Sequence, residues 1–357
     1  MWKTRGHEAA VELLKSSLGQ DRVSHAYLIT GPERIGKATL TRELAMALNC
    51  TAWQGEAQPT LFGEAEVVDA EPGPCYHCAS CLKALAGSHP DILVIEEWTT
   101  ERGSMTDQVR SIQYGSGLLP FEGHRKVYLL LNAEDMTGAA QNTLLKTLEE
   151  PAPTVCLILT AATPRALLPT VVSRCQHLQL RAPSAEAIAE ALVDMRETEL
   201  ERARQLAAFA AGRIGWALAA ADDPALLEQR QAALDALAAA LGGGTVPRFR
   251  LAETLAASDP EAVDDVLELW LSWLRDLLLV VEGLPDRAVN RDQLDRLQVA
   301  ASQLRGRDVQ AAIRSVQAAR SQVAGAINTR MALEVLALRL PRLVPSPAAF
   351  AVRAGPG

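Results

Sequence analysis

Three absences in the sequence narrow the class of protein. No uncharged apolar run reaches the length of about 18 residues that a membrane helix needs, and the first twenty residues are too charged for a signal region. The net charge is −8, so the chain lacks the basic excess of a free-standing DNA-binding protein. We therefore expect a soluble, cytoplasmic protein without membrane contact, whose contacts with nucleic acid are local or shared with partners.

Lysine is absent from the chain after Lys146, and this marks a change in composition. Residues 183–357 carry nineteen arginines and long Ala/Leu-rich stretches with helical spacing, whereas strand-like runs precede them. The pattern predicts an α/β part followed by an all-helical part. We expect domains at 1–182, 183–241 and 248–343, a Gly/Pro linker at 242–247 and a flexible tail at 344–357.

The stretch 30–39, TGPERIGKAT, matches a phosphate-binding loop in all but one position. Gly31, Gly36 and Lys37 have the required spacing, while Ala38 stands where the motif has the Ser or Thr hydroxyl that binds Mg²⁺. The pattern predicts phosphate-loop ancestry, because backbone N–H groups at such a turn face an anion. Without the hydroxyl, we expect ATP binding to be weak or absent.

The residues around this loop support the assignment. A strand-like run at 26–29 precedes it, and apolar residues at helical spacing follow it at 40–48. Residues 89–95 and 126–131 predict further buried strands, and the second of these would end at the nucleotide site. A glycine-rich turn with a purely structural role is the alternative interpretation.

Four of the six cysteines have the spacing of a metal site. Cys50 lies upstream of Cys75, Cys78 and Cys81, a CxxCxxC run, and four thiolates suit a structural tetrahedral Zn²⁺. A histidine, His77 or His89, could replace one ligand, and an iron–sulfur cluster is a further alternative. The other two cysteines, Cys156 and Cys175, are expected to be buried and without a metal. Residues 54–74 are interpreted as a surface insert.

Four features together resemble the bacterial DNA polymerase III clamp-loader family of AAA+ proteins. These are GPERIGK at 31–37, the four cysteines, NTLLKTLEEP at 142–151 and SRC at 173–175. The resemblance covers residues 1 to about 220 and, more loosely, the rest. It implies an α/β AAA+ P-loop domain with a parallel sheet and a zinc module at 50–81, a small helical lid, and a helical collar that joins subunits.

The nucleotide site departs from the family's gamma/tau motor subunits and resembles that of a non-hydrolysing subunit. Leu131 and Asn132 stand where the motor subunits carry the Walker B acids, and alanines at 161–162 stand where they carry a sensor hydroxyl. The segment 212–218 resembles sensor 2, with Arg213 as a displaced substitute for its arginine. The gap before Cys75 is longer than is usual in the family.

Arg174, next to Ser173 in the SRC triplet, is retained. In the family, this arginine enters the ATP site of the neighbouring subunit, where a guanidinium can stabilise the charge of the transition state. The resemblance thus implies a trans arginine finger, whereas an isolated arginine at a domain edge would indicate an ordinary salt bridge.

The resemblance therefore implies a subunit of the DNA polymerase III clamp loader that has no ATPase activity of its own. The implied partners are the gamma/tau and delta subunits, the sliding clamp, and primer-template DNA through the complex. Arg110 is a candidate phosphate contact, with a solvated surface arginine as the alternative. Competing hypotheses are a gamma/tau-like active ATPase, in which Thr39 or Glu134 replaces the lost ligands, and a zinc-dependent nucleic-acid-binding module.

Overall fold

The computed structural model describes residues 2–54, 71–98, 104–324 and 328–344. Most of the predicted insert and all but the first residue of the predicted tail lie outside these ranges. The chain divides into two compact units, one formed by Met1–Met195 with Gly212–Trp216 and the other by Arg196–Ala211 with Ala217–Gly357. The domain boundaries expected from the sequence stay predictions.

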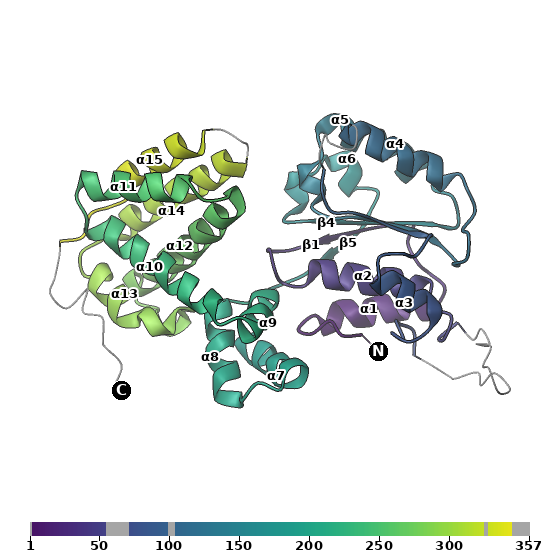
Figure 1. Cartoon of the computed structure of the whole chain (residues 1–357), viewed down its shortest axis with the longest axis horizontal. Helices are drawn as coiled ribbons and strands as arrows, with labels where there is room; N and C mark the ends of the chain where they lie inside the picture. Colours follow the sequence, from purple (N-terminus) through teal and green to yellow (C-terminus); the bar gives the residue numbers. More distant parts are fainter. Residues whose placement is uncertain (1, 55–70, 99–103, 325–327, 345–357) are drawn as a thin grey trace. The chain divides into compact units, whose positions relative to one another are not determined.

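The first unit is a parallel sheet with helices on both faces (Figure 1). In the described residues its strand order is β2-β3-β4-β1-β5. Its strands and main helices, in chain order, are α1 (Glu8–Gly19), β1 (Ala26–Thr30), α2 (Lys37–Leu48), α3 (Ala79–Leu85), β2 (Ile92–Ile95), α4 (Met105–Ser116), β3 (Lys126–Leu130), α5 (Gly138–Glu149), β4 (Val155–Ala161), α6 (Pro169–Val172), β5 (Gln176–Gln179) and α7 (Ala185–Arg196).

The central strands β1 and β4 are buried along their whole length, because helices cover both faces. Alternate side chains point to opposite faces, so Tyr27 and Ile29 pack in the core beneath α1 and α2, and Leu28 packs in the core beneath α4 and α5. The phosphate-loop stretch leaves the carboxyl end of β1, at the centre of the sheet. The predicted α/β class is confirmed.

The expectation of a buried strand at 89–95 is wrong in two respects. The strand β2 begins only at Ile92, and it is an edge strand whose Leu93 is 44% exposed. An apolar run of this length is compatible with an edge or a central strand, and only the pairing partners decide between them.

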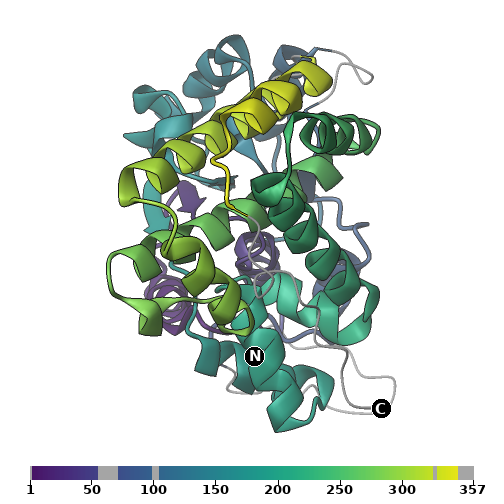
Figure 2. The ribbon, with the colours of Figure 1, turned by 90° about the vertical axis from the view of Figure 1, so that its left-hand side faces the viewer.

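From residue 200 onward the described elements are helices. The α-helices are α8 (Leu200–Ala210), α9 (Ile214–Asp222), α10 (Ala225–Gly242), α11 (Thr245–Ala256), α12 (Pro260–Val281), α13 (Leu294–Ala301), α14 (Gly306–Ala324) and α15 (Thr329–Arg339), and two short 3₁₀ helices precede α13. Helix α15 packs against α11 and α14 (Figure 2). Trp270 and Trp273 are buried in the apolar core of the second unit. None of the helices in the described ranges combines the length and apolarity needed to cross a membrane.

Candidate functional site

The phosphate loop joins β1 to the first turn of α2. Gly31 has φ of 154°, and a Cβ atom there would lie 2.7 Å from the carbonyl oxygen of Leu180, so only glycine fits. Gly36, the N-cap of α2, has φ of 104°. The structure thus places Gly31, Gly36 and Lys37 in one strand-to-helix turn, as a phosphate cradle requires.

Lys37 turns its ammonium group onto its own loop. The Nζ atom donates to the carbonyl oxygens of Gly31, at 2.7 Å, and Pro32, at 2.9 Å. The next two residues differ from the metal-binding pattern, since Ala38 has no hydroxyl and Thr39 is exposed. The loop therefore carries a cation but offers no side-chain oxygen ligand at position 38.

The ends of β3 and β4, together with the phosphate loop, make up what we call the candidate nucleotide corner. The N–H of Gly31 donates to the carbonyl oxygen of Ala161 at 3.2 Å, so the end of β4 lies beside the loop. Leu131 is buried, and Asn132 has φ of 49° with its N–H donating to Thr160 Oγ1 at 3.0 Å. The positions at which a Walker B motif would hold Mg²⁺ and polarise water carry neither carboxylate.

Glu134, two residues after Asn132, is the nearest carboxylate that could replace the missing Walker B acids. Its Oε1 atom accepts a hydrogen bond from the N–H of Ala162 at 2.8 Å. Its Oε2 atom is buried and accepts no hydrogen bond from the described residues. One carboxylate oxygen is thus engaged by the turn after β4.

The predicted sensor 2 segment reaches the same loop. The N–H of Gly215 donates to the carbonyl oxygen of Arg34 at 2.8 Å. Arg213 is buried, and its guanidinium carbon lies 5.9 Å from the ring centroid of Trp216. The structure brings this segment to the phosphate loop, while the role of Arg213 toward a nucleotide stays a prediction.

Arg174 lies toward the opposite end of the sheet from the phosphate loop. It precedes β5, whose first residue Gln176 pairs with Tyr27 near the amino end of β1. The phosphate loop follows Thr30 at the carboxyl end of β1. Because strands rise about 3.3 Å per residue, at least about 10 Å of strand separates Arg174 from the loop.

The Arg174 side chain is 34% exposed and contacts one residue of α5 and one of α6. Its Nη2 atom pairs with Glu149 Oε1 at 2.6 Å. Its Nη1 atom donates to the carbonyl oxygen of Thr170 at 2.9 Å and contacts Ser173 Oγ at 3.4 Å. These contacts hold the guanidinium near the surface, away from the chain's own nucleotide corner.

Arg110 lies on the exposed side of α4. Its side chain is 65% exposed, and Nη1 pairs with Asp107 Oδ1 at 2.8 Å. Ser104 caps this helix by accepting a hydrogen bond from the N–H of Asp107. The geometry leaves Arg110 at the surface, and a contact with phosphate stays a prediction.

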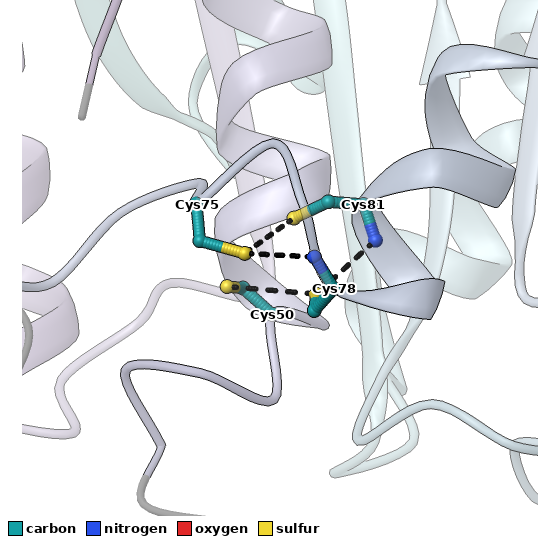
Figure 3. Close-up of side chains that lie close together, drawn as sticks. All are labelled: Cys50, Cys75, Cys78 and Cys81. Carbon is teal, nitrogen blue, oxygen red and sulfur yellow. Dashed lines mark hydrogen bonds between the residues drawn. The ribbon is translucent and has the colours of Figure 1, made fainter. Parts of the chain in front are cut away.

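The four predicted cysteines meet at one point (Figure 3). Their Sγ atoms all lie within 4.8 Å of one another, with Cys75 and Cys81 at 3.8 Å and Cys50 and Cys78 at 4.0 Å. Four thiolates bound at about 2.3 Å to a tetrahedral zinc stand about 3.8 Å apart. The donor set and its spacing therefore fit a metal ion of this kind.

Local structure explains how this cluster forms. Cys50 follows α2, and Cys78 is the N-cap of α3, where its Sγ accepts a hydrogen bond from the N–H of Cys81. The Cys75 sulfur accepts from the N–H of Cys78 at 3.2 Å. Interaction with the Cys81 sulfur holds the pKa of the Cys50 thiol below its usual value, and the same interaction raises the pKa of Cys81. Cys50 is thus the sulfur most disposed to the thiolate form, the form that binds metal.

The two nearby histidines are engaged elsewhere. His77 Nδ1 lies 2.8 Å from the carbonyl oxygen of Cys75. His89 is buried, with Nε2 3.0 Å from Ser80 Oγ and Nδ1 accepting from the N–H of Asp91. In the described part of the chain, the group of four ligands consists of the cysteines and includes neither histidine.

Sequence reasoning missed two buried carboxylates that shape this unit. Glu43, in α2, is 2% exposed, and Asp91, before β2, is 3% exposed. The sequence carried one signal for them, an acidic residue inside or beside an apolar run. Such a residue is unusual, because a charged group is buried only when it is paired or hydrogen-bonded.

The sequence matches two family models. The model described as "DNA polymerase III, delta subunit" matches residues 6–184, half of the chain. The model of its C-terminal part matches residues 224–341. Together these matches cover the sheet, the phosphate loop, the four cysteines and most of the helical region.

Three individual relatives each match part of the chain. The chain is 32% identical to DNA polymerase III subunit delta' of Bacillus subtilis, over 52% of this chain and 50% of that protein. It is 36% identical to the delta' subunit of Pseudomonas aeruginosa, over 51% and 52%. It is 31% identical to subunit tau of Escherichia coli, over 66% of this chain and 35% of that protein. The chain thus spans about half the length of the delta' relatives it matches.

A solved structure also aligns with the chain. The crystal structure of a DNA polymerase III gamma subunit-related protein from Thermotoga maritima covers 92% of this chain and 98% of that chain. The TM-score is 0.38 and the sequence identity is 16%.

Proposed function

The chain belongs to the DNA polymerase III delta-subunit family of clamp-loader proteins, and on this premise we propose that it is a delta-prime-like subunit that hydrolyses no ATP itself. In this proposal it supplies Arg174 to the ATP site of a neighbouring gamma/tau subunit. The complex uses ATP to place the sliding clamp on primed DNA, and the neighbours carry out the hydrolysis.

The placement of Arg174 is the observation that carries the proposal. The guanidinium lies toward the opposite end of the sheet from the phosphate loop of its own chain. The chain's own corner meanwhile lacks a hydroxyl at Ala38 and carboxylates at Leu131 and Asn132. An arginine in this position is suited to act on a nucleotide held by another subunit.

In this proposal, Glu149 is the partner that Arg174 gives up when it binds the neighbour's nucleotide. In the free chain it pairs with Arg174 at 2.6 Å, and the carbonyl oxygen of Thr170 accepts a hydrogen bond from the same guanidinium. A partly exposed pair of this kind is weak, so a neighbour's γ-phosphate can replace it. The planar fork of the guanidinium then binds phosphate oxygens in two places, which a lysine cannot do.

Exposed apolar residues support the proposal that the chain works as part of a protein complex. Leu118, Leu119 and Phe121, in the turn after α4, are 50%, 80% and 84% exposed, and Tyr114 is also exposed. Apolar groups that gather at a surface are typical of contacts with other proteins. The delta and gamma/tau subunits and the sliding clamp are the proposed protein partners, and DNA is contacted through the complex.

The four cysteines are proposed to hold one structural zinc ion. Zinc would supply no chemistry to ATP hydrolysis, because a site with four sulfur ligands leaves no open position. Its role would be to join the loop 75–81 to the end of α2.

The experiment compares Arg174→Ala with Lys37→Ala in the assembled clamp loader. We expect Arg174→Ala to slow hydrolysis on the order of 10³-fold at the neighbouring site that it faces, because it removes the charge that stabilises the transition state. Lys37→Ala should leave the rate nearly unchanged. Single-turnover ATP hydrolysis by the reconstituted complex measures both.

The controls separate a chemical role from a structural one. Arg165→Ala removes another exposed arginine and should have no effect. Arg174→Lys keeps the charge but loses the planar guanidinium, so it should retain only part of the rate of the unmodified complex.

A different result would favour a gamma/tau-like motor. In that case the isolated chain would hydrolyse ATP, and Lys37→Ala would abolish this activity. The Oε2 of Glu134, which accepts no hydrogen bond from the described residues, would then be the candidate oxygen ligand.

A further inference from the structure

Residues 2–7 run from the segment before the cysteines to the phosphate loop. At one end, the indole N–H of Trp2 donates to the carbonyl oxygen of Pro72 at 3.1 Å, and Lys3 Nζ lies 4.1 Å from the ring centroid of Tyr76. At the other end, His7 Nε2 lies 2.6 Å from the carbonyl oxygen of Ile35, inside the phosphate loop. One short segment thus touches both candidate sites.

Glu43 fastens this segment to the cysteine loop. Its Oε1 atom accepts from the N–H of Lys3, at 2.5 Å, and from the Tyr76 hydroxyl. Its Oε2 atom accepts from the N–H of Thr4, at 3.1 Å, and from Thr4 Oγ1, at 2.5 Å. A carboxylate has about four acceptor sites, so these donors from two segments saturate it.

The Tyr76 hydroxyl depends on the conformation of the cysteine loop. Tyr76 lies between Cys75 and Cys78, with φ of 66°, an unfavourable conformation for a residue with a large side chain. A metal bound to both neighbouring sulfurs would fix that turn and with it the position of the hydroxyl. Glu43 is 2% exposed, so losing one donor leaves its buried carboxyl group less well satisfied.

We propose that Glu43 is a positioning residue that couples metal binding at the four cysteines to the docking of residues 2–7, and through His7 to the phosphate loop. The inference rests on the proposed zinc centre. It does not depend on the role of Arg174.

Coupling of this kind is reciprocal. If zinc strengthens the docking of residues 2–7, then the docked segment strengthens zinc binding by the same factor. Disturbing the contacts of Glu43 from either side should therefore weaken zinc binding, although no cysteine has changed.

The experiment removes one donor from each side of Glu43. Tyr76→Phe takes away the hydroxyl on the cysteine loop, and Thr4→Val takes away the hydroxyl on the segment 2–7. We expect each variant to bind Zn²⁺ about tenfold more weakly, a typical effect of altering groups that support metal ligands. A chelator competition assay on the full chain measures the affinity. The matched controls Tyr114→Phe, at an exposed position in α4, and Thr143→Val, at a half-buried position in α5, should bind zinc normally.

Two further measurements distinguish coupling from general damage. The spectrum of Co²⁺ bound to both variants should keep its tetrahedral four-sulfur form, because the ligands are intact. Hydrogen exchange of residues 2–8 and 31–37 should accelerate when zinc is removed from the unmodified chain. A zinc affinity of both variants equal to that of the unmodified chain, or unchanged exchange on zinc removal, would overturn the coupling. A purified chain that binds no zinc would overturn the zinc centre as well, and neither result would bear on Arg174.

Discussion

At the scale of single residues, Asp91 shows how one buried carboxylate orders a surface turn. Its Oδ1 atom accepts from the N–H of Phe121 at 2.7 Å, and Oδ2 accepts from Glu122 and Gly123 at 2.9 and 2.8 Å. These bonds fix the backbone of the turn that exposes Leu119 and Phe121. Burial opposes ionisation of Asp91, but the three N–H donors outweigh it and hold its pKa below the usual value.

Replacing Asp91 should destabilise the first unit. Asp91→Asn removes the charge that three N–H groups share, and hydrogen bonds to charged groups are the stronger kind, so we expect the free energy of unfolding to fall by about 2 kcal/mol. Urea unfolding followed by circular dichroism measures the change. Asp21→Asn is the control, because that residue is exposed and its positive φ also suits asparagine.

The same residue predicts a pH dependence. A carboxyl group whose pKa is lower in the folded state stabilises the fold above its unfolded pKa of about 3.9. This contribution is lost as the pH falls through the lower folded pKa. The difference in stability between the natural chain and Asp91→Asn should therefore be constant near neutral pH and shrink below about pH 4. A difference that stays the same in acid would contradict the assignment.

At the scale of elements, Arg248 joins the ends of two helices in the second unit. From α11, its guanidinium donates to the carbonyl oxygens of Leu241 at the end of α10 and of Ala337, Leu340 and Pro341 at the end of α15. Carbonyl groups at a helix end lack partners within the helix and carry partial negative charge. A buried cation is thus stabilised by backbone groups, without an acidic partner among them.

Removing this cation should loosen the helical unit. Arg248→Met keeps most of the side-chain volume but leaves buried carbonyl groups without donors, so we expect a loss of about 3 kcal/mol in the free energy of unfolding. Arg250→Met, at an exposed position two residues on, should have little effect. Denaturant unfolding measures both variants, and equal stability of the two would show that the four bonds contribute nothing.

At the scale of the whole molecule, the described residues form separate apolar cores in the two units. Leu267, Trp270 and Leu333 belong to a core made of residues 234–340, whereas the cores on the two faces of the sheet and the apolar residues around the cysteines lie in the first unit. Each unit can therefore lose its packing without the other having to do so.

We expect two thermal transitions in calorimetry. Chelation of zinc should lower only one of them, since all four cysteines lie in the first unit. Arg248→Met should lower only the other, by roughly 5–10 °C. A single transition that moves with both changes would show that the units unfold together.

Several parts of the site were predictable because they are local in the sequence. The glycines of the phosphate loop are required by backbone conformations within one turn, and three of the four cysteines lie within seven residues. The motifs also indicated the clamp-loader family, which the family models confirm. The roles of Arg174 and Arg213 stay predictions, since neither motif nor match tests them.

Other features could not be predicted, because they depend on partners far apart in the chain. The edge position of β2 follows from which strands pair, and the apolar run 92–95 is compatible with either place. The four bonds of Glu43 bring together α2, residues 3–4 and Tyr76, and Asp91 is satisfied by residues thirty positions away. A sequence can show that an acidic residue lies unusually in an apolar run, but it does not show which N–H and O–H groups will donate hydrogen bonds to it.

The sequence by itself determined the fold class, the phosphate-loop turn and the set of cysteines, because spacing along one chain fixes which residue types can share a turn or a helix face. Only the tertiary structure decided that Arg174 lies toward the far end of the sheet from that turn, and that residues 2–7 connect the cysteines to the loop. Those relations depend on strand pairing and on the need of buried charges for donors, which are properties of the folded chain.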